Sequence, residues 1–130
     1  MQQALLIALG GALGSVARYG LSTYIAHASR GDFPWGTLIV NLGGSFLIGV
    51  FVEFFDTALI PSEWRSFITI GFLGGYTTFS TFALETVNLI RDGELPLATL
   101  NVAATNVLGV LVVALGLYSS RFVIMLFSHR

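Results

Sequence analysis

The chain contains no cysteine and no lysine, and charged residues make up only 10% of its 130 positions. The absence of cysteine excludes disulfides and thiolate metal sites, and it leaves the redox compartment undetermined. A soluble domain carries about 25% charged residues, so this chain has too few of them to cover a water-exposed surface. With 55% hydrophobic residues and a mean hydropathy of +0.82, it is predicted to be an integral membrane protein.

Net charge and the titratable residues argue against two further classes of protein. The net charge is −1, so no basic surface indicates a nucleic-acid partner. The two histidines lie near a predicted span end and near the C-terminus. Without cysteine they leave no nucleophile–base pair and no metal site of the usual kind. We therefore expect neither nucleic-acid binding nor enzymatic activity.

Four apolar stretches are long enough to cross a bilayer, which takes about 20 mostly apolar residues per helix. They predict an all-α membrane protein with one four-helix domain over residues 1–130. The N-terminus has no positively charged segment, so the first stretch is expected to remain in the mature protein rather than act as a cleaved signal peptide. The predicted spans cover approximately residues 4–26, 36–59, 65–90 and 95–127.

The third stretch contains residues that lipid should reject. Gly74 and Gly75 are poor residues for a helix interior, and four hydroxyl side chains follow within residues 77–81. Irregular backbone at membrane depth is tolerated only where protein buries it or where it lines a watery path. We therefore expect the third helix to be broken near its centre and to line a binding or permeation site.

Small residues four positions apart predict close contacts between helices. Such pairs allow backbones to approach in lipid, where dispersion and hydrogen bonds drive association. Glycine is also simply common in membrane helices, so the pattern has two explanations. The pairs are Gly10 with Gly14, Ser45 with Gly49, and Gly71 with Gly75.

The arginines hardly fix an orientation in the membrane. Arg65, Arg121 and Arg130 fall on the side of the N-terminus, and Arg30 and Arg91 fall on the other. A clear excess on one side would set one topology. Near balance favours insertion in both directions and an antiparallel homodimer, although a single topology set weakly by Arg65 and Arg121 remains open.

Polar residues within the spans are functional candidates by default, because burying them costs free energy. Arg18 either reaches the interface or lines an aqueous vestibule, and Asn41 either joins helices or offers amide donors to an anion.

Thr77, Thr81 and Glu85 are spaced as one polar stripe on a helix. Two nearby phenylalanines, Phe79 and Phe82, either pack in the core or present positively polarised ring edges.

Residues 71–85, GFLGGYTTFSTFALE, closely resemble the signature of the Fluc fluoride channel family, also called CrcB. GSVARY at residues 14–19 and GTLIVN at residues 36–41 are also similar to that family, as is the presence of four spans in a chain of this length. The resemblance covers nearly the whole chain. It implies a passive fluoride exporter in the cell (inner) membrane of a bacterium, built as an antiparallel, dual-topology homodimer with two pores and a structural sodium ion.

The resemblance also implies roles for individual residues. Gly74 and Thr77 would give backbone carbonyls to sodium, and Glu85 matches a family glutamate of undefined role. The fourth span matches the family pattern less well, and Thr105, Asn106 and Gly109 occupy the stretch expected to face the pore. The implied fluoride pathway comprises Arg18, Asn41, Phe79, Ser80, Thr81, Phe82, Glu85, Thr105 and Asn106.

Two other functions compete with this interpretation. A small dual-topology multidrug exporter also has four short spans, but proton-coupled export needs a membrane-buried carboxylate, typically early in the chain. Here the first span carries Arg18 instead, and the nearest such carboxylate is Glu85. A non-transporting assembly subunit would explain the glycines but not the hydroxyl cluster or Asn41.

Overall fold

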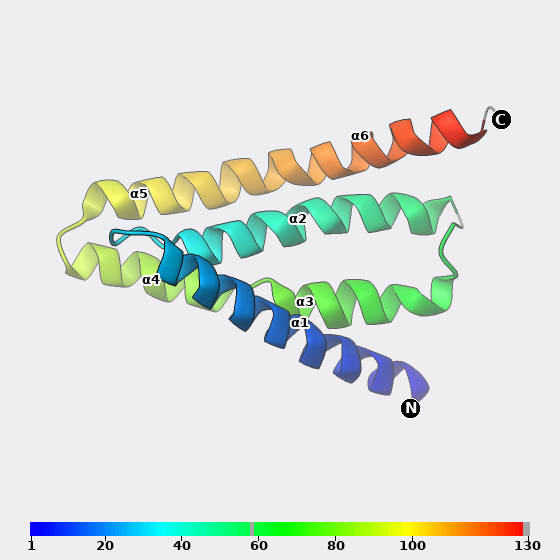
Figure 1. Cartoon of the computed structure of the whole chain (residues 1–130), viewed down its shortest axis with the longest axis horizontal. Coiled ribbons are helices and arrows are strands. Elements are labelled where there is room, and N and C mark those ends of the chain that lie inside the picture. Colours follow the sequence, from blue (N-terminus) through cyan, green and yellow to red (C-terminus); the bar gives the residue numbers. More distant parts are fainter. Residues whose placement is uncertain (58, 129–130) are drawn as a thin grey trace.

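The computed structural model describes residues 1–57 and 59–128, with the backbone alone for Ser128. Every regular element in this part of the chain is helical (Figure 1). Four helical stretches, Gln2–Ala28, Trp35–Asp56, Ser62–Arg91 and Leu95–Phe127, are long and apolar enough to cross a membrane. The predicted all-α class and the number of spans are confirmed.

The first two spans are single helices, α1 (Gln2–Ala28) and α2 (Trp35–Asp56). The loop between them turns at Gly31, whose φ of 109° lies in the region that favours glycine. The predicted end of the second span at residue 59 was too late, although residue 58 lies outside the described residues. Thr57 is the C-terminal cap of the helix, with φ −91° and ψ 6°, and its hydroxyl bonds back to the Glu53 carbonyl at 2.8 Å.

The third span consists of several segments. A 3₁₀ turn, η1 (Ser62–Trp64), precedes the π-helix η2 (Ser66–Leu73) and the short α-helix α3 (Gly74–Tyr76). The backbone is then extended at Thr77 (φ −82°, ψ 158°) and Thr78 (φ −149°, ψ 122°). Helix α4 (Phe79–Arg91) begins with Thr78 as its cap, whose side chain accepts a hydrogen bond from the Thr81 N–H.

The fourth span begins after Gly93, which has a φ of 82°. Helix α5 (Leu95–Ala103) carries a proline in its first turn, where the missing N–H has no helical partner to lose. A short π-helix, η3 (Ala104–Leu108), joins it to α6 (Gly109–Ser128). The predicted bounds of this span are therefore correct within one residue.

Glycines allow the helix backbones to come close together. A Cβ on Gly14 would lie 2.9 Å from the Tyr76 backbone nitrogen, and one on Gly75 would lie 2.6 Å from the Gly11 carbonyl oxygen. Gly10 and Gly71 likewise face each other between α1 and the third span. Gly49 of α2 meets the α6 backbone, so the predicted close packing is confirmed at the two glycine pairs and at the glycine of the Ser45–Gly49 pair.

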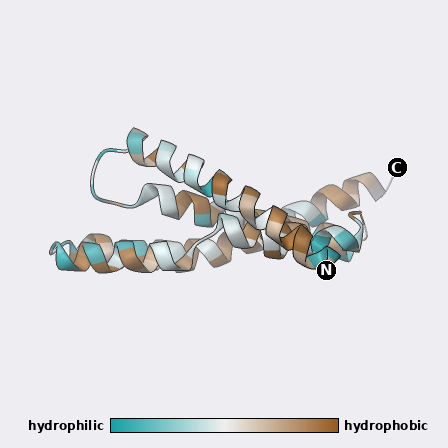
Figure 2. Cartoon of the chain, turned by 90° about the horizontal axis from the view of Figure 1, so that it is seen from below, coloured by the Kyte–Doolittle hydropathy of each residue, from teal (hydrophilic) through white to brown (hydrophobic). Residues whose placement is uncertain are grey.

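Helix α2 lies between α5–α6 and the third span, with α1 crossing the third span at an angle (Figure 1). The start of α1 and the last turn of α6 lie at one end of the molecule with η1, and the α1–α2 and α4–α5 loops lie at the other. Figure 2 shows hydrophobic residues along the helices and hydrophilic residues concentrated toward the two ends of the molecule. This arrangement separates Arg30 and Arg91 from Arg65 as predicted, while Arg130 lies outside the described residues.

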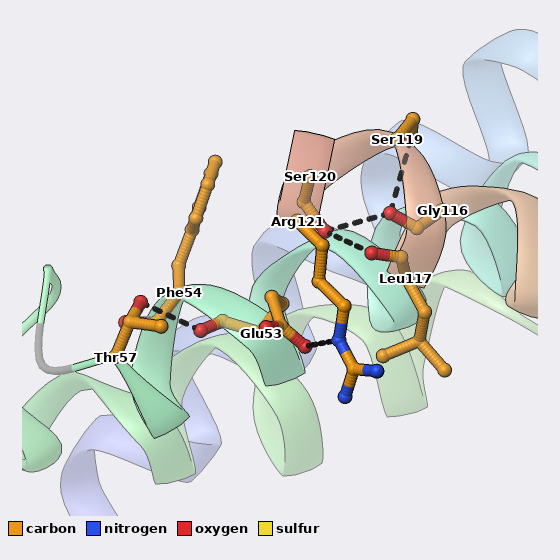
Figure 3. A network of polar contacts seen from close by, with 8 residues as sticks. All are labelled: Glu53, Phe54, Thr57, Gly116, Leu117, Ser119, Ser120 and Arg121. Atoms are coloured by element: carbon orange, nitrogen blue, oxygen red, sulfur yellow. Dashed lines mark hydrogen bonds and ion pairs between the residues drawn. The ribbon is translucent and has the colours of Figure 1, made fainter. Parts of the chain in front are cut away.

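An ion pair joins α2 to α6 near the end that carries η1 (Figure 3). The Arg121 Nε donates to Glu53 Oε2 at 2.8 Å, and the Glu53 side chain is only 11% exposed. Beside it, the Ser120 hydroxyl bonds the carbonyls of Gly116 and Leu117 at 2.8 and 2.9 Å. The buried carboxylate of Glu53 is therefore paired, as a charge at this depth requires.

Candidate functional site

Asn41 of α2 holds the extended residues of the third span. Its Nδ2 donates to the Thr78 carbonyl oxygen at 3.0 Å, and the Thr78 N–H donates to its Oδ1 at 2.8 Å. The Thr78 N–H lacks a helical partner, and the Thr78 carbonyl lies at the N-cap of α4; a primary amide offers an acceptor to the first and a donor to the second. The second Nδ2 hydrogen of Asn41 has no hydrogen-bond partner among the described residues. Asn41 thus joins two helices and still offers a donor.

A cavity of about 370 Å³ opens beside this contact, between α2, the third span and the start of η3. Its wall mixes hydroxyls, backbone and two aromatic rings, as a path for a small polar solute requires. It brings together most of the residues predicted from the motif in the third span. The lining residues are Asn41, Gly44, Ser45, Ile48, Thr69, Leu73, Gly74, Thr77, Thr78, Phe79, Phe82 and Thr105.

The two phenylalanines line the cavity in different ways. Their ring centroids lie 5.7 Å apart with planes tilted by 54°. Phe82 is 7% exposed and belongs to the core, whereas Phe79 is 79% exposed on the surface of the single chain. Phe82 therefore gives the cavity a fixed wall, and the outer face of Phe79 is not covered by its own chain.

Arg18 lies at a second hollow on the other side of the extended segment. The hollow has a volume of about 220 Å³ and is lined by α1, α2 and the third span. Arg18 is half-buried there, and its Nη1 lies 3.5 Å from the Thr77 carbonyl oxygen. Thr78 borders both hollows, and Thr81 lines the second. The guanidinium is thus held inside the protein.

Glu85 lies one turn beyond Thr81 on α4. Its Oε1 accepts a hydrogen bond from the buried Thr37 hydroxyl at 2.7 Å, and its Oε2 is buried without a partner among the described residues. The predicted stripe of Thr77, Thr81 and Glu85 is wrong at Thr77. That residue is extended rather than helical, and its hydroxyl donates back to the Leu73 carbonyl at 3.0 Å.

The remaining candidates separate into different environments. Thr105 lines the larger cavity, and its Oγ1 is buried without a hydrogen-bond partner among the described residues. Asn106 is exposed, and its Nδ2 donates to the Val102 carbonyl of its own helix at 2.8 Å. Ser80 is exposed and lines neither of the two hollows. Thr105 and Asn106, adjacent in sequence, thus face different surroundings.

Asn101 and Thr37 lie near these cavities but were not among the site residues predicted from the sequence. Asn101 is 1% exposed, and its Nδ2 donates to the Thr86 Oγ1 at 3.0 Å. Thr37 is the partner of Glu85. Asn101 precedes Thr105 by four residues, so counting back one helical turn from Thr105 would have identified it.

The Gly74 and Thr77 carbonyls suit a hard cation. In a continuous helix the Thr78 N–H would bond the Gly74 carbonyl, but here it bonds Asn41. The Thr77 carbonyl accepts a long contact from Arg18 Nη1, at 3.5 Å. Oxygen donors of this kind are the preferred ligands of hard metal ions. The residues present therefore fit the implied sodium ion.

Comparison with known proteins identifies relatives along nearly the whole chain. It is 51% identical over 117 residues to a fluoride-specific ion channel of Geobacter metallireducens, covering 88% of this chain and 94% of the relative. It is 47% identical over 114 residues to one of Paramagnetospirillum magneticum, covering 85% and 89%. A third from Parabacteroides distasonis is 42% identical over 124 residues, covering 95% and 97%.

These bacterial relatives and the four long apolar helices indicate a multi-pass membrane protein of a bacterial family. The family described as CrcB-like protein, Camphor Resistance (CrcB) matches residues 5–117, which include both hollows and all the candidate residues. This chain belongs to the CrcB family.

Proposed function

We propose that this protein is a fluoride-selective passive channel that lets fluoride leave the cell across the inner membrane. The observation that carries the proposal is its similarity, over 85–95% of its length, to proteins named as fluoride-specific ion channels. The family has a transport role and no enzymatic one. Nothing in these relatives supports the alternative of a proton-coupled multidrug exporter.

The larger cavity offers what a small, strongly hydrated anion requires. Removing water from fluoride is costly unless protein donors replace it. The free Nδ2 hydrogen of Asn41, the Thr105 hydroxyl and the edges of the phenyl rings are such donors. None carries a full positive charge, so the ion is held weakly enough to leave again.

The second hollow forms the approach to this cavity in the proposal. Arg18 supplies a positive charge that attracts anions without standing in the narrow part of the path. Thr81, together with Glu85 and Thr37, lies on the face between this hollow and the loop end of the molecule. Ser80 and Asn106, exposed in the single chain, belong to the pathway only if a second copy covers them.

We further propose that the functional unit is an antiparallel homodimer. The exposed outer face of Phe79 leaves the cavity incomplete within one chain, and large apolar side chains are exposed along every long helix. The arginines are nearly balanced between the two ends, so neither orientation in the membrane is strongly favoured. Two opposed copies would cover each other's broken third spans.

A structural sodium ion would then lie between the two interruptions of the third span. Gly74 and Thr77 from each copy would hold it through backbone oxygens, which lipid would otherwise leave unsatisfied at several kcal/mol each. The ion would neutralise converging carbonyl dipoles, and Arg18 would compete for the Thr77 oxygen. Replacing sodium with N-methylglucamine should lower the melting temperature of the purified protein, and an unchanged melting temperature would count against the ion.

Efflux from liposomes containing the purified protein tests the function. Vesicles loaded with potassium fluoride or potassium chloride are made permeable to potassium with valinomycin, and the released anion is recorded with ion-selective electrodes. We expect rapid fluoride release and little chloride release without any proton gradient. Comparable release of both anions, or fluoride release that requires a proton gradient, would contradict the proposal.

A further inference from the structure

Two side chains and one backbone carbonyl form a continuous chain of hydrogen bonds between the fourth span and α4. The Asn101 Nδ2 donates to the Thr86 Oγ1 at 3.0 Å, and the Thr86 hydroxyl donates to the Phe82 carbonyl oxygen at 2.8 Å. Asn101 is 1% exposed, which makes it the most buried polar side chain among the described residues. The chain of bonds ends on the residue whose ring forms the fixed wall of the larger cavity.

The two hydrogen bonds run in one direction, from Asn101 through Thr86 to Phe82. The Thr86 hydroxyl has a single hydrogen, which it gives to Phe82, so it can only accept from Asn101. The Asn101 amide is therefore oriented with its NH₂ group toward α4. A carboxylate at this position would instead draw the Thr86 hydrogen to itself and release the Phe82 carbonyl.

The contact also sets the position of the fourth span. Asn101 and Thr105 lie four residues apart and so share one face of the span. Helices α4 and α5 pack side by side, joined by the short turn at Gly93. A shift of α5 against α4 would therefore move the Phe82 ring and the Thr105 hydroxyl relative to each other.

We propose that Asn101 is a positioning residue for the pore: through Thr86 it fixes the turn of α4 that carries Phe82, opposite Thr105. This inference rests on the proposed function. Asn101 itself lines neither of the two hollows, so it acts through its neighbours.

Substitutions at both ends of the bond test this role. Asn101→Leu and Thr86→Val each remove the bond, and each should lower fluoride efflux about fivefold, since one interhelical hydrogen bond in a membrane is worth roughly 1 kcal/mol. The double variant should fall no further than Thr86→Val, because that single variant already removes both hydrogen bonds of the chain. Thr86→Ser keeps the hydroxyl and should restore efflux to near the wild-type rate.

Thr99→Val is the matched control. It also removes a threonine hydroxyl near this contact, but the Thr99 hydroxyl bonds only the Leu95 carbonyl of its own helix, at 2.9 Å. Its efflux should equal that of the wild type. Wild-type efflux in Asn101→Leu, or losses that add in the double variant, would overturn the proposal. If Asn101→Leu does not fold, the comparison of Thr86→Val with Thr86→Ser decides.

Hydrogen–deuterium exchange gives a readout that does not depend on transport. Loss of the bond should speed amide exchange in residues 82–90 of α4 but not in α1. Unchanged exchange in Asn101→Leu would overturn the anchoring role. If the wild type itself released no fluoride, the proposed function would fail while exchange would still decide whether Asn101 holds α4.

Discussion

Asn41 and Thr78 bond each other twice, with the Asn41 amide acting toward the Thr78 peptide as a neighbouring strand would. The two distances, 3.0 Å from Nδ2 to the carbonyl oxygen and 2.8 Å from the N–H to Oδ1, leave neither backbone group of Thr78 without a partner. The extended backbone at Thr78 is therefore held by α2, which supplies an acceptor for its N–H and a donor for its carbonyl. A residue proposed for the pore thus also supports its backbone.

Asn41→Asp should abolish fluoride efflux. The carboxylate keeps the acceptor for the Thr78 N–H but loses both amide hydrogens, so the Thr78 carbonyl loses the donor from α2 and the anion meets a negative charge. Efflux from liposomes measures the effect, and the elution profile in detergent checks that the protein remains assembled. Efflux at the wild-type rate would leave Asn41 with a packing role only.

Phe79→Ile and Phe82→Ile should both impair efflux, because the polarised ring edge is lost while bulk is roughly kept. Their effects on stability should differ. Phe82 is buried, so its replacement should cost about 1 kcal/mol in packing, whereas Phe79 is exposed on the single chain. Parallel measurements of efflux and melting temperature separate the two effects. If neither variant changes efflux, the rings serve only to pack the helices.

Thr105→Val should reduce fluoride efflux more than Asn106→Leu. Thr105 lines the larger cavity and its buried hydroxyl has no hydrogen-bond partner among the described residues, while the Asn106 amide bonds its own helix on an exposed face. Valine matches threonine in shape, so the first variant removes a donor with little change in volume. Equal loss in both variants would show that a second copy brings Asn106 into the path.

The sequence predicted the number of spans and the close packing at glycine pairs, and its candidate site residues include six of the twelve that line the larger cavity. It succeeded there because hydropathy, small-residue spacing and one dense motif are local signals. The predicted polar stripe was wrong at Thr77, because helical periodicity no longer places side chains once the backbone becomes extended. Asn101 was missed although it lies one helical turn before Thr105, and its partner Thr86 becomes visible only once α4 is folded beside it.

Gly14→Ala should destabilise the folded protein, and Gly20→Ala in the same helix should not. A Cβ at Gly14 would clash with the backbone of Phe72 and Tyr76, whereas Gly20 has no atom within 4 Å of that position in its own chain. Melting temperature in detergent measures both, and alanine at an open helical site slightly favours the helix. A large loss for Gly20→Ala would instead indicate that this face of α1 meets another copy.

Labelling from the two sides of the membrane tests the antiparallel arrangement. The chain has no cysteine, so single substitutions give clean sites: His27→Cys near the loop end and Ser62→Cys in η1, at the opposite end. Both side chains are exposed in the structure. A membrane-impermeant thiol reagent is applied to intact vesicles and then to opened ones.

In an antiparallel homodimer, each site faces outward in one copy and inward in the other. Intact vesicles should therefore label about half of the molecules at either position, because near balance of the arginines gives each orientation a similar weight. A parallel dimer with one topology would label one position fully and leave the other unlabelled until the vesicles are opened. That result would reject the antiparallel pairing, and with it the proposal that two opposed breaks share one sodium ion.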